Sequence, residues 1–249
     1  MTEKRPLVAV LTGAGISTDS GIPDYRGPQG LWQRDPSAQE LVTIGPYLAS
    51  TEVRRRSWLM RRDAGAVDAK PNAGHRALVE LERSGVPMRV LTQNVDGLHQ
   101  AAGLTARKVI ELHGTATEVQ CERCKAVGPM AAALERVAAG EDDPACEQCG
   151  GVLRPRTVMF GETLDERVLT QADAIAKGCQ VFVAVGSSLQ VHPAALLPRI
   201  ALEHGAKLIV VNGEPTPYDG EAHEVIREPI SEALPKLVRR LVDGDLARG

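Results

Sequence analysis

Four cysteines in two closely spaced pairs are the plainest chemical feature of the sequence. Cys121 and Cys124 form one C-x-x-C pair, Cys146 and Cys149 form the other, and 21 residues separate the two pairs. Four thiolates at such a spacing suit a tetrahedral zinc ion with bonds of about 2.3 Å. Because the protein fills all four positions, the predicted zinc is structural; a redox-active pair is the weaker alternative.

One histidine, His113, stands where acid–base chemistry is expected. It follows a short apolar run and precedes Gly114, so we place it at the end of a strand. An imidazole has a reference pKa of about 6.5 and can take up a proton near neutral pH. The other histidines have less chemical context. We interpret two as packing or capping residues of helices and three as surface residues, namely His75 and His99, then His192, His204 and His223.

Short apolar runs must position these groups. They occupy residues 7–11, 88–91, 109–112, 181–185 and 207–211. Continuous apolar runs are typical of strands buried on both faces of a parallel sheet, where ligands bind beyond the carboxyl ends of the strands. We therefore predict one shared site, built from the polar clusters that end the five runs: Gly13-Ala14-Gly15, Gln93-Asn94-Val95-Asp96, His113-Gly114, Gly186-Ser187-Ser188 and Asn212-Gly213-Glu214.

Helical patterns between the runs complete the fold. They cover 75–84, with Asn72 as a cap, and then 167–177, 193–204 and 231–242. The alternation predicts an α/β fold, a Rossmann-like parallel sheet with helices on both faces. Two stretches break the alternation and are predicted to form a smaller zinc-binding and helical module. The predicted domains are 1–33, 71–118 and 155–249 for the sheet, and 34–70 and 119–154 for the module.

The glycine pair after the first run is ambiguous by itself. Glycines there allow the backbone to approach a phosphate, but Thr18 stands where the pattern G-x-G-x-x-G needs its third glycine. A tight strand-to-helix turn is an equally good interpretation. The second run ends in Gln93-Asn94 and not in the acidic residue that reads ribose in dehydrogenases, so a nucleotide must be held differently.

Taken in order, these motifs resemble the sirtuin family. Residues 13–17 and 21–27 are similar to the family signature G-A-G-I-S-x-x-S-G-I-P-D-F-R-G, 93–99 resembles Q-N-x-D-x-L-H, and 111–114 resembles E-x-H-G. The cysteine pairs and the later motifs follow in the family's order, and the resemblance extends from about residue 5 to residue 242.

The resemblance implies that NAD binds between the Rossmann-like domain and the zinc module. Ser17, Ile22, Asn94 and Asp96 would form the pocket for the nicotinamide amide, and Arg26 would help to order a loop over NAD. The implied NAD-binding residues are Gly13, Ala14, Gly15, Ser17, Ile22, Asp24, Tyr25, Arg26, Gln93, Asn94, Asp96, Gly186, Ser187, Ser188, Asn212, Gly213, Glu214 and Ile230. The residues implied to pair with a substrate peptide as an added strand are Val158, Phe160, Gly161 and Glu162.

The activity that the resemblance implies is NAD-dependent deacylation of protein lysines. The acyl oxygen would attack the ribose carbon as nicotinamide leaves. His113, as the general base, would deprotonate a ribose hydroxyl that then attacks the imidate carbon. The products would be nicotinamide, an O-acyl-ADP-ribose and free lysine, and the partner would be an acyl-lysine protein.

Three positions depart from the family pattern. Tyr25 stands where many members have Phe, and Ser187 stands where Thr is common. Members that prefer succinyl groups carry a Tyr-x-x-Arg pair, whereas the comparable stretch here, Trp58 to Arg61, matches only the arginine. Arg61 is equally well interpreted as a surface residue, so the sequence does not identify the preferred acyl group.

Other functions remain as alternatives. A protein mono-ADP-ribosyltransferase would use the same activated ribose with a protein nucleophile. A zinc-ribbon module for nucleic acid is disfavoured by the net charge of −3 and by the absence of aromatic residues interleaved with basic ones. No apolar run reaches 18 residues and the first run is too short for a signal peptide, so we expect a cytoplasmic protein without a membrane span. The oligomeric state stays open.

Overall fold

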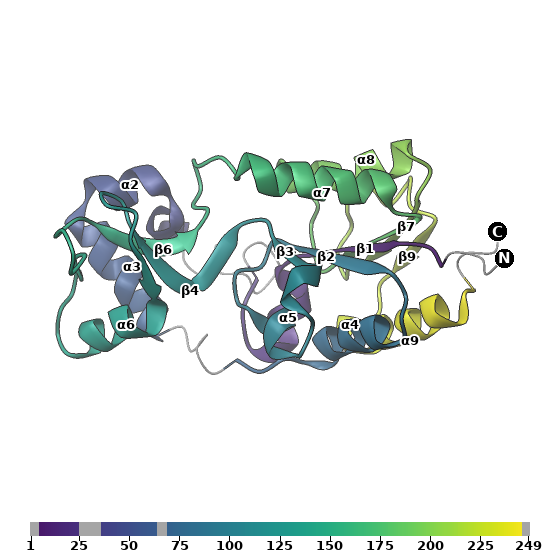
Figure 1. Cartoon of the computed structure of the whole chain (residues 1–249), viewed down its shortest axis with the longest axis horizontal. Helices are drawn as coiled ribbons and strands as arrows, with labels where there is room; N and C mark the ends of the chain where they lie inside the picture. Colours follow the sequence, from purple (N-terminus) through teal and green to yellow (C-terminus); the bar gives the residue numbers. More distant parts are fainter. Residues whose placement is uncertain (1–4, 25–35, 64–68, 246–249) are drawn as a thin grey trace.

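A parallel sheet of six strands forms the centre of the larger part of the molecule (Figure 1). The computed structural model describes residues 5–24, 36–63 and 69–245, so Tyr25 and Arg26 lie outside the described residues. Neighbouring strands are parallel and follow the order β3-β2-β1-β7-β8-β9, the doubly wound order of Rossmann-like folds. The strands are β1 (Val8–Thr12), β2 (Met88–Thr92), β3 (Val109–Glu111), β7 (Val181–Val185), β8 (Lys207–Val211) and β9 (Glu224–Ile226).

Two helices cover each face of this sheet (Figure 1). On one face lie α4 (Ala73–Arg83) and α9 (Ile230–Asp243), and on the other lie α7 (Glu166–Gly178) and α8 (Leu197–Glu203). Shorter helices occupy the connections: η1 (Ala14–Ser20), α5 (Leu98–Ala101), η4 (Ala106–Lys108) and η5 (Ala194–Leu196).

The two cores explain why β1 is apolar up to its last residue, Thr12. Val8 and Val10 pack with α4 and α9, whereas Ala9 and Leu11 pack with α7 and α8. All residues of β1 are buried, because side chains on both faces of the strand are covered. The predicted Rossmann-like sheet is therefore confirmed.

A smaller antiparallel sheet with its own helices forms the second part. Its strand order is β5-β4-β6, and its core is a separate cluster around the fully buried Trp58. β4 continues the chain directly after His113, so the two parts join next to this residue. The elements are η2 (Pro36–Val42), α2 (Ile44–Ala49), α3 (Thr51–Asp63), β4 (Gly114–Cys121), β5 (Val127–Pro129), α6 (Met130–Ala138) and β6 (Leu153–Thr157).

The helix predicted over 193–204 is divided. Ala194–Leu196 forms the 3₁₀ helix η5, and the regular helix α8 begins only at Leu197. Pro198 lacks a backbone N–H and is tolerated only in the first turn of a helix, which fixes where α8 starts. In residues 5–24, 36–63 and 69–245, no helix has both the length and the apolar character that crossing a membrane requires.

Candidate active site

The loops after β1 and β7 touch where the strand order reverses. Gly13 N–H donates to the Val185 carbonyl and Gly15 N–H to the Gly186 carbonyl, each at 2.9 Å. A Cβ on Gly15 would lie 2.8 Å from Gly186 Cα, and a Cβ on Gly186 would lie 2.5 Å from Ile16 N. Gly186 also has a φ of +60°, which favours glycine. Close packing of the two loops therefore accounts for these glycines.

The Ser17 hydroxyl, on η1, joins two other segments, the loop after β2 and the start of α4. It donates to Asp96 Oδ2 at 2.7 Å and accepts from Asn94 Nδ2 at 3.1 Å. His75 Nε2 lies 3.5 Å from Ser17 Oγ, and it carries the proton in the neutral ring because His75 Nδ1 accepts a backbone N–H. The hydroxyl thus has its proton and both lone pairs engaged, which fixes a carboxylate and an amide side by side.

Gln93 holds the ring of His113 in place. His113 Nδ1 lies 2.9 Å from the Gln93 carbonyl oxygen, and the Gln93 side chain donates from Nε2 to Ser187 Oγ at 2.9 Å. Groups from the ends of β2, β3 and β7 are thereby connected. A carbonyl oxygen can only accept, so Nδ1 carries the proton, and the lone pair of the neutral ring is on Nε2. No hydrogen bond joins this Nε2 to another residue in the described part of the chain.

Burial sets the protonation state of His113. Desolvation lowers its pKa from the ordinary value of 6.5, and the hydrogen bond to the Gln93 carbonyl opposes this shift without reversing it. The ring is therefore neutral at pH 7, with Nε2 as an available base.

Buried polar side chains beside these loops form hydrogen bonds with one another. Thr12 Oγ1 donates to Thr92 Oγ1 at 2.8 Å and lies 2.9 Å from His99 Nε2. His99 is 2% exposed, and burial lowers its pKa to about 3. The rings of His75 and His99 lie 5.1 Å apart, and Asn72 and His75 form a capping box at the start of α4. The interpretation of both histidines as capping and packing residues is confirmed.

The loop after β8 lies at the carboxyl end of its strand, like the loops described above. Asn212 Nδ2 donates to the Glu214 carbonyl at 2.8 Å, and Arg227 Nη1 donates to the Asn212 carbonyl at 2.7 Å. Ile230 begins α9 and packs against the core of the sheet. The other implied NAD-binding residues are half-buried or exposed beside these loops, namely Ala14, Ile22, Asp24, Ser188 and Gly213.

The segment Val158–Glu162 already pairs with protein backbone. Val158 N–H donates to the His113 carbonyl at 2.8 Å. Phe160 N–H donates to the Val42 carbonyl at 2.9 Å, and the Phe160 carbonyl accepts from Ile44 N–H at 3.0 Å. The Phe160 N–H is therefore not available to an added peptide strand. Arg61, on α3, is half-buried and donates to the Ser57 carbonyl at 2.9 Å.

The four paired cysteines converge in the small module, and their geometry suits zinc. Their Sγ atoms all lie within 4.8 Å of one another, with 3.5 Å between Cys121 and Cys149 and 3.7 Å between Cys124 and Cys146. A tetrahedral zinc ion would separate its sulfurs by about 3.8 Å. A Cβ on Gly151 would lie 2.9 Å from Cys121 Sγ, so the turn around the sulfurs is tight.

The fifth cysteine, Cys179, lies apart from this cluster. It is buried after α7, and burial raises the pKa of its thiol to about 11. It packs as a small apolar residue.

Several supporting residues were missed by sequence reasoning. Thr12 and Thr92 had a readable signal, because each is a polar residue that ends a buried strand. Arg227 and Arg154 had none. Arg154 bonds to Glu122, which precedes it by 32 residues, so no local pattern records the contact.

Comparison with known proteins shows a close relationship to one family. The model of the Sir2 family matches residues 13–193. A protein of Streptomyces coelicolor named NAD-dependent protein deacetylase 2 is 68% identical over 237 residues, which cover 95% of this chain and 98% of that protein.

Solved structures give the same result. One that describes the mechanism and regulation of Sir2 enzymes has a TM-score of 0.85 at 41% identity and covers 96% of this chain and 93% of its own. Another, a Sir2 protein with a deacetylated p53 peptide and 3′-O-acetyl-ADP-ribose, has a TM-score of 0.85 at 36% identity, with 95% and 92% of the two chains covered.

Proposed function

The chain belongs to the Sir2, or sirtuin, family, and from this premise we propose that it is an NAD-dependent protein-lysine deacylase. One observation of the structure carries the proposal. His113 has its Nδ1 proton directed to the Gln93 carbonyl, so its unprotonated Nε2 is available beside the carboxyl ends of β1, β2, β3 and β7, whose loops are joined by hydrogen bonds. The named relatives, which are NAD-dependent deacetylases, support the same activity.

His113 is proposed as the general base. NAD supplies an electrophilic ribose carbon and the ribose hydroxyls when it is bound. Nε2 accepts the proton of one hydroxyl, and the positive charge that develops on the ring is stabilised through Nδ1 by the Gln93 carbonyl. General-base help of this kind contributes about 10²–10⁴-fold in rate.

Ser17, Asn94 and Asp96 are proposed to receive the nicotinamide amide. These hydrogen-bond acceptors suit a carboxamide: the Asp96 carboxylate and the Asn94 carbonyl oxygen can both accept N–H groups. Asn94 Nδ2 is held by Ser17 Oγ and by the Gly13 carbonyl, each at 3.1 Å, so the amide orientation is set before a ligand arrives. The Asn94 oxygen makes no hydrogen bond to another described residue, which leaves it available.

The remaining site residues keep the roles that the sequence suggests. Gly13, Ala14, Gly15, Gly186, Ser187, Ser188, Asn212, Gly213, Glu214 and Ile230 are proposed to line the dinucleotide, with Asp24 and Gln93 as further NAD-binding residues and Ile22 in the nicotinamide pocket. The segment Val158–Glu162 is proposed to receive the acyl-lysine peptide. Because the N–H groups of Val158, Phe160 and Glu162 are all used within the chain, pairing with the peptide would fall on the Gly161 N–H and on carbonyl oxygens of the segment.

The division into two domains is also a proposal. The predicted boundaries at 118/119 and 154/155 fall inside β4 and β6, so the strands of the small sheet span both. A zinc ion held by Cys121, Cys124, Cys146 and Cys149 would cross-link the small module without an open coordination position, and so would supply no catalytic chemistry. A cytoplasmic location is supported by this thiolate set, which needs a reducing compartment.

Nicotinamide release tests the proposed function. The protein is incubated with NAD and peptides that carry acetyl-, propionyl- or succinyl-lysine, with the unmodified lysine peptide as control. We expect release that depends on an acyl peptide, with one deacylated lysine for each nicotinamide. No acyl-dependent release across the panel would contradict the proposal. Transfer of labelled ADP-ribose to protein without any acyl peptide would instead indicate the ADP-ribosyltransferase alternative.

A further inference from the structure

One arginine connects the metal-binding module to the segment proposed to bind peptide. Arg154 lies on β6, and its side chain is only 13% exposed. Its guanidinium donates to Glu162 through two bonds, Nη1 to Oε2 at 2.9 Å and Nη2 to Oε1 at 2.8 Å. Nη1 also donates to the Thr157 carbonyl at 3.0 Å. Arg154 therefore holds both ends of the segment Val158–Glu162.

The segment Val158–Glu162 contains a tight turn that is closed by its own hydrogen bonds. Glu162 N–H donates to the Met159 carbonyl at 3.1 Å, and Gly161 in the turn has a φ of +90°. The Glu162 carboxylate also accepts Met159 N–H at 2.8 Å. The carboxylate that Arg154 grips is thus the same group that closes the turn.

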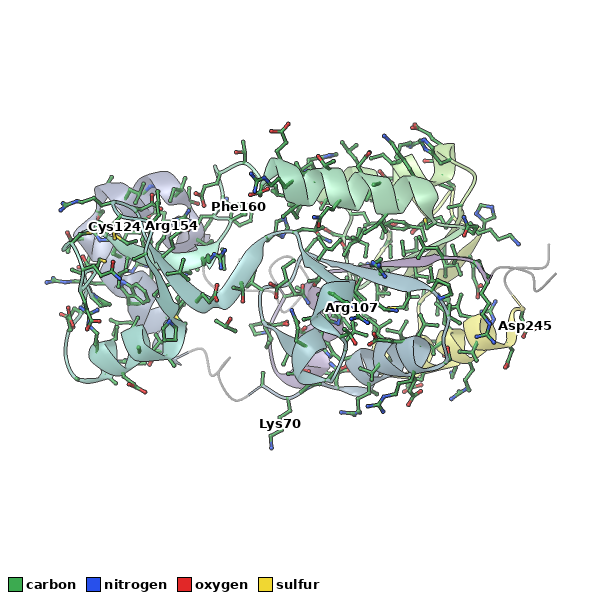
Figure 2. The ribbon with its side chains drawn as sticks, viewed as in Figure 1. Lys70, Arg107, Cys124, Arg154, Phe160 and Asp245 are labelled. Carbon is green, nitrogen blue, oxygen red and sulfur yellow. The ribbon has the colours of Figure 1, made fainter. Side chains whose placement is uncertain are left out.

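The other side of Arg154 faces the metal ligands. Arg154 Nε donates to Glu122, the residue directly after Cys121. Glu122 N–H donates to the Val152 carbonyl at 2.9 Å, so the backbone next to the ligand is paired with the start of β6. In Figure 2, the labelled Cys124, Arg154 and Phe160 lie in the same part of the molecule, away from Arg107 and Asp245.

We propose that Arg154 is a positioning residue that holds the segment Val158–Glu162 in its peptide-binding form by anchoring it to the metal-binding module. The inference rests on the proposed function, because that segment must receive the acyl peptide. A guanidinium can bind two carboxylates and a carbonyl at fixed angles, which an ammonium group on a flexible stem cannot do. A preformed segment binds peptide without first being ordered, so Arg154 acts on peptide affinity and not on the chemical step.

The test compares Arg154→Gln with Arg156→Gln. Arg156 lies two residues along the same strand and pairs with Glu118, but these side chains are 52% and 38% exposed, and such surface pairs contribute little. We expect Arg154→Gln to raise KM for the acyl peptide about tenfold, since charged hydrogen bonds are lost. kcat and KM for NAD should stay within about twofold, and Arg156→Gln should match the wild type in all three.

Hydrogen exchange gives a readout that does not depend on activity. The amides of Met159 and Glu162 should exchange faster in Arg154→Gln than in the wild type and in Arg156→Gln, with full zinc content retained. Glu162→Gln should raise KM for the peptide as well, and the double variant with Arg154→Gln should be no worse than the single ones, because both act through one contact.

The outcomes separate the two proposals. Absence of acyl-dependent turnover in the wild type contradicts the proposed function. Hydrogen exchange at Met159 and Glu162 that is as slow in Arg154→Gln as in the wild type contradicts this inference alone. An unchanged KM for the peptide in a zinc-loaded Arg154→Gln protein also overturns it. If that variant does not fold, Arg154→Lys and Glu122→Gln take its place: a smaller rise in peptide KM supports the inference, and no rise overturns it.

Discussion

The large sheet and the metal-binding module are stabilised by different means. The large part buries two extensive hydrophobic clusters, one on each face of the parallel sheet. Among the described residues, the small part has one cluster of eight buried residues, two of which, Cys121 and Cys146, belong to the candidate zinc site. A core of that size supplies little stability alone, so we expect the module to depend on a bound zinc ion.

The two parts therefore differ in where polar, reactive side chains lie relative to the hydrophobic core. In the large part, apolar strands provide stability, and the polar groups at their ends bond to one another: Ser17 to Asp96 and Asn94, Gln93 to Ser187 and His113. In the small part, the candidate zinc ligands Cys121 and Cys146 belong to the hydrophobic core. The same cysteines would therefore stabilise the module and hold its strands in place. The candidate site lies at the junction of the two parts, next to the start of β4.

Removal of zinc should produce the largest difference in stability between the two parts. Binding of structural zinc contributes about 10–16 kcal/mol to the folding of small zinc modules. With a chelator, amides of β4, β5 and β6 should exchange rapidly with solvent, while those of β1, β7 and β8 stay protected. Hydrogen exchange followed by mass spectrometry measures both, and readdition of zinc is the control. Equal loss of protection in both sheets would show that the parts are not stabilised independently.

Replacement of His113 should affect chemistry without affecting either core. His113→Ala should lower kcat about 10²–10⁴-fold, because Nε2 is the proposed base, while Kd for NAD changes little. Single-turnover rates and calorimetric titration with NAD provide the two numbers. The surface variant His192→Ala serves as control, since that histidine is exposed. A kcat near that of the wild type would remove His113 from the mechanism.

A methyl group at the junction of the two loops should destabilise the large part. Gly186→Ala places a Cβ 2.5 Å from Ile16 N at a φ of +60° and should cost about 1–3 kcal/mol or more. Gly178→Ala is the matched control: this glycine ends α7 with nothing within 4 Å of its added Cβ, so stability should be kept or slightly raised. Urea unfolding measures both. Equal midpoints for the two variants would mean that the loop contact is not tight.

Mild acid should weaken the large part through its buried histidines. The pKa of His99 is about 3 in the folded chain and about 6.5 when unfolded, so the unfolded state binds more protons between these values. Its contribution to stability is complete above pH 6.5 and falls by roughly 1.4 kcal/mol per pH unit as the pH drops toward 3. His75 and His113 have lowered pKa values from burial and act in the same direction. Unfolding free energies from pH 7 to 4 should show a shallower slope in His99→Gln than in His192→Gln.

The contrast also explains what could be predicted from the sequence. β1, β2, β7 and β8 were found because both faces of each are covered, which leaves a nearly all-apolar run. β4 was missed because the residues of Gly114–Cys121 are mostly half-buried and polar. β9 has only three half-buried residues and lies at the edge of the sheet, where no strong pattern is required.

The site was predictable in outline and not in its contacts. Strand ends converge at one edge of a parallel sheet whatever the side chains are, so His113, Asn94 and Gly186 could be grouped from their positions alone. The direction of the His113 ring could not, because it depends on a carbonyl that lies 20 residues away in the chain. The anchoring contacts of Arg154 likewise join residues that only the folded chain brings together.

The most direct test of the account is a crystal structure with NAD and an acyl-lysine peptide bound together. We predict that His113 Nε2 lies within hydrogen-bonding reach, about 2.6–3.2 Å, of a hydroxyl on the ribose that carries nicotinamide, and that Nδ1 still donates to the Gln93 carbonyl. A ring turned away from that sugar, or a dinucleotide bound elsewhere than at the ends of β1, β2 and β7, would contradict it.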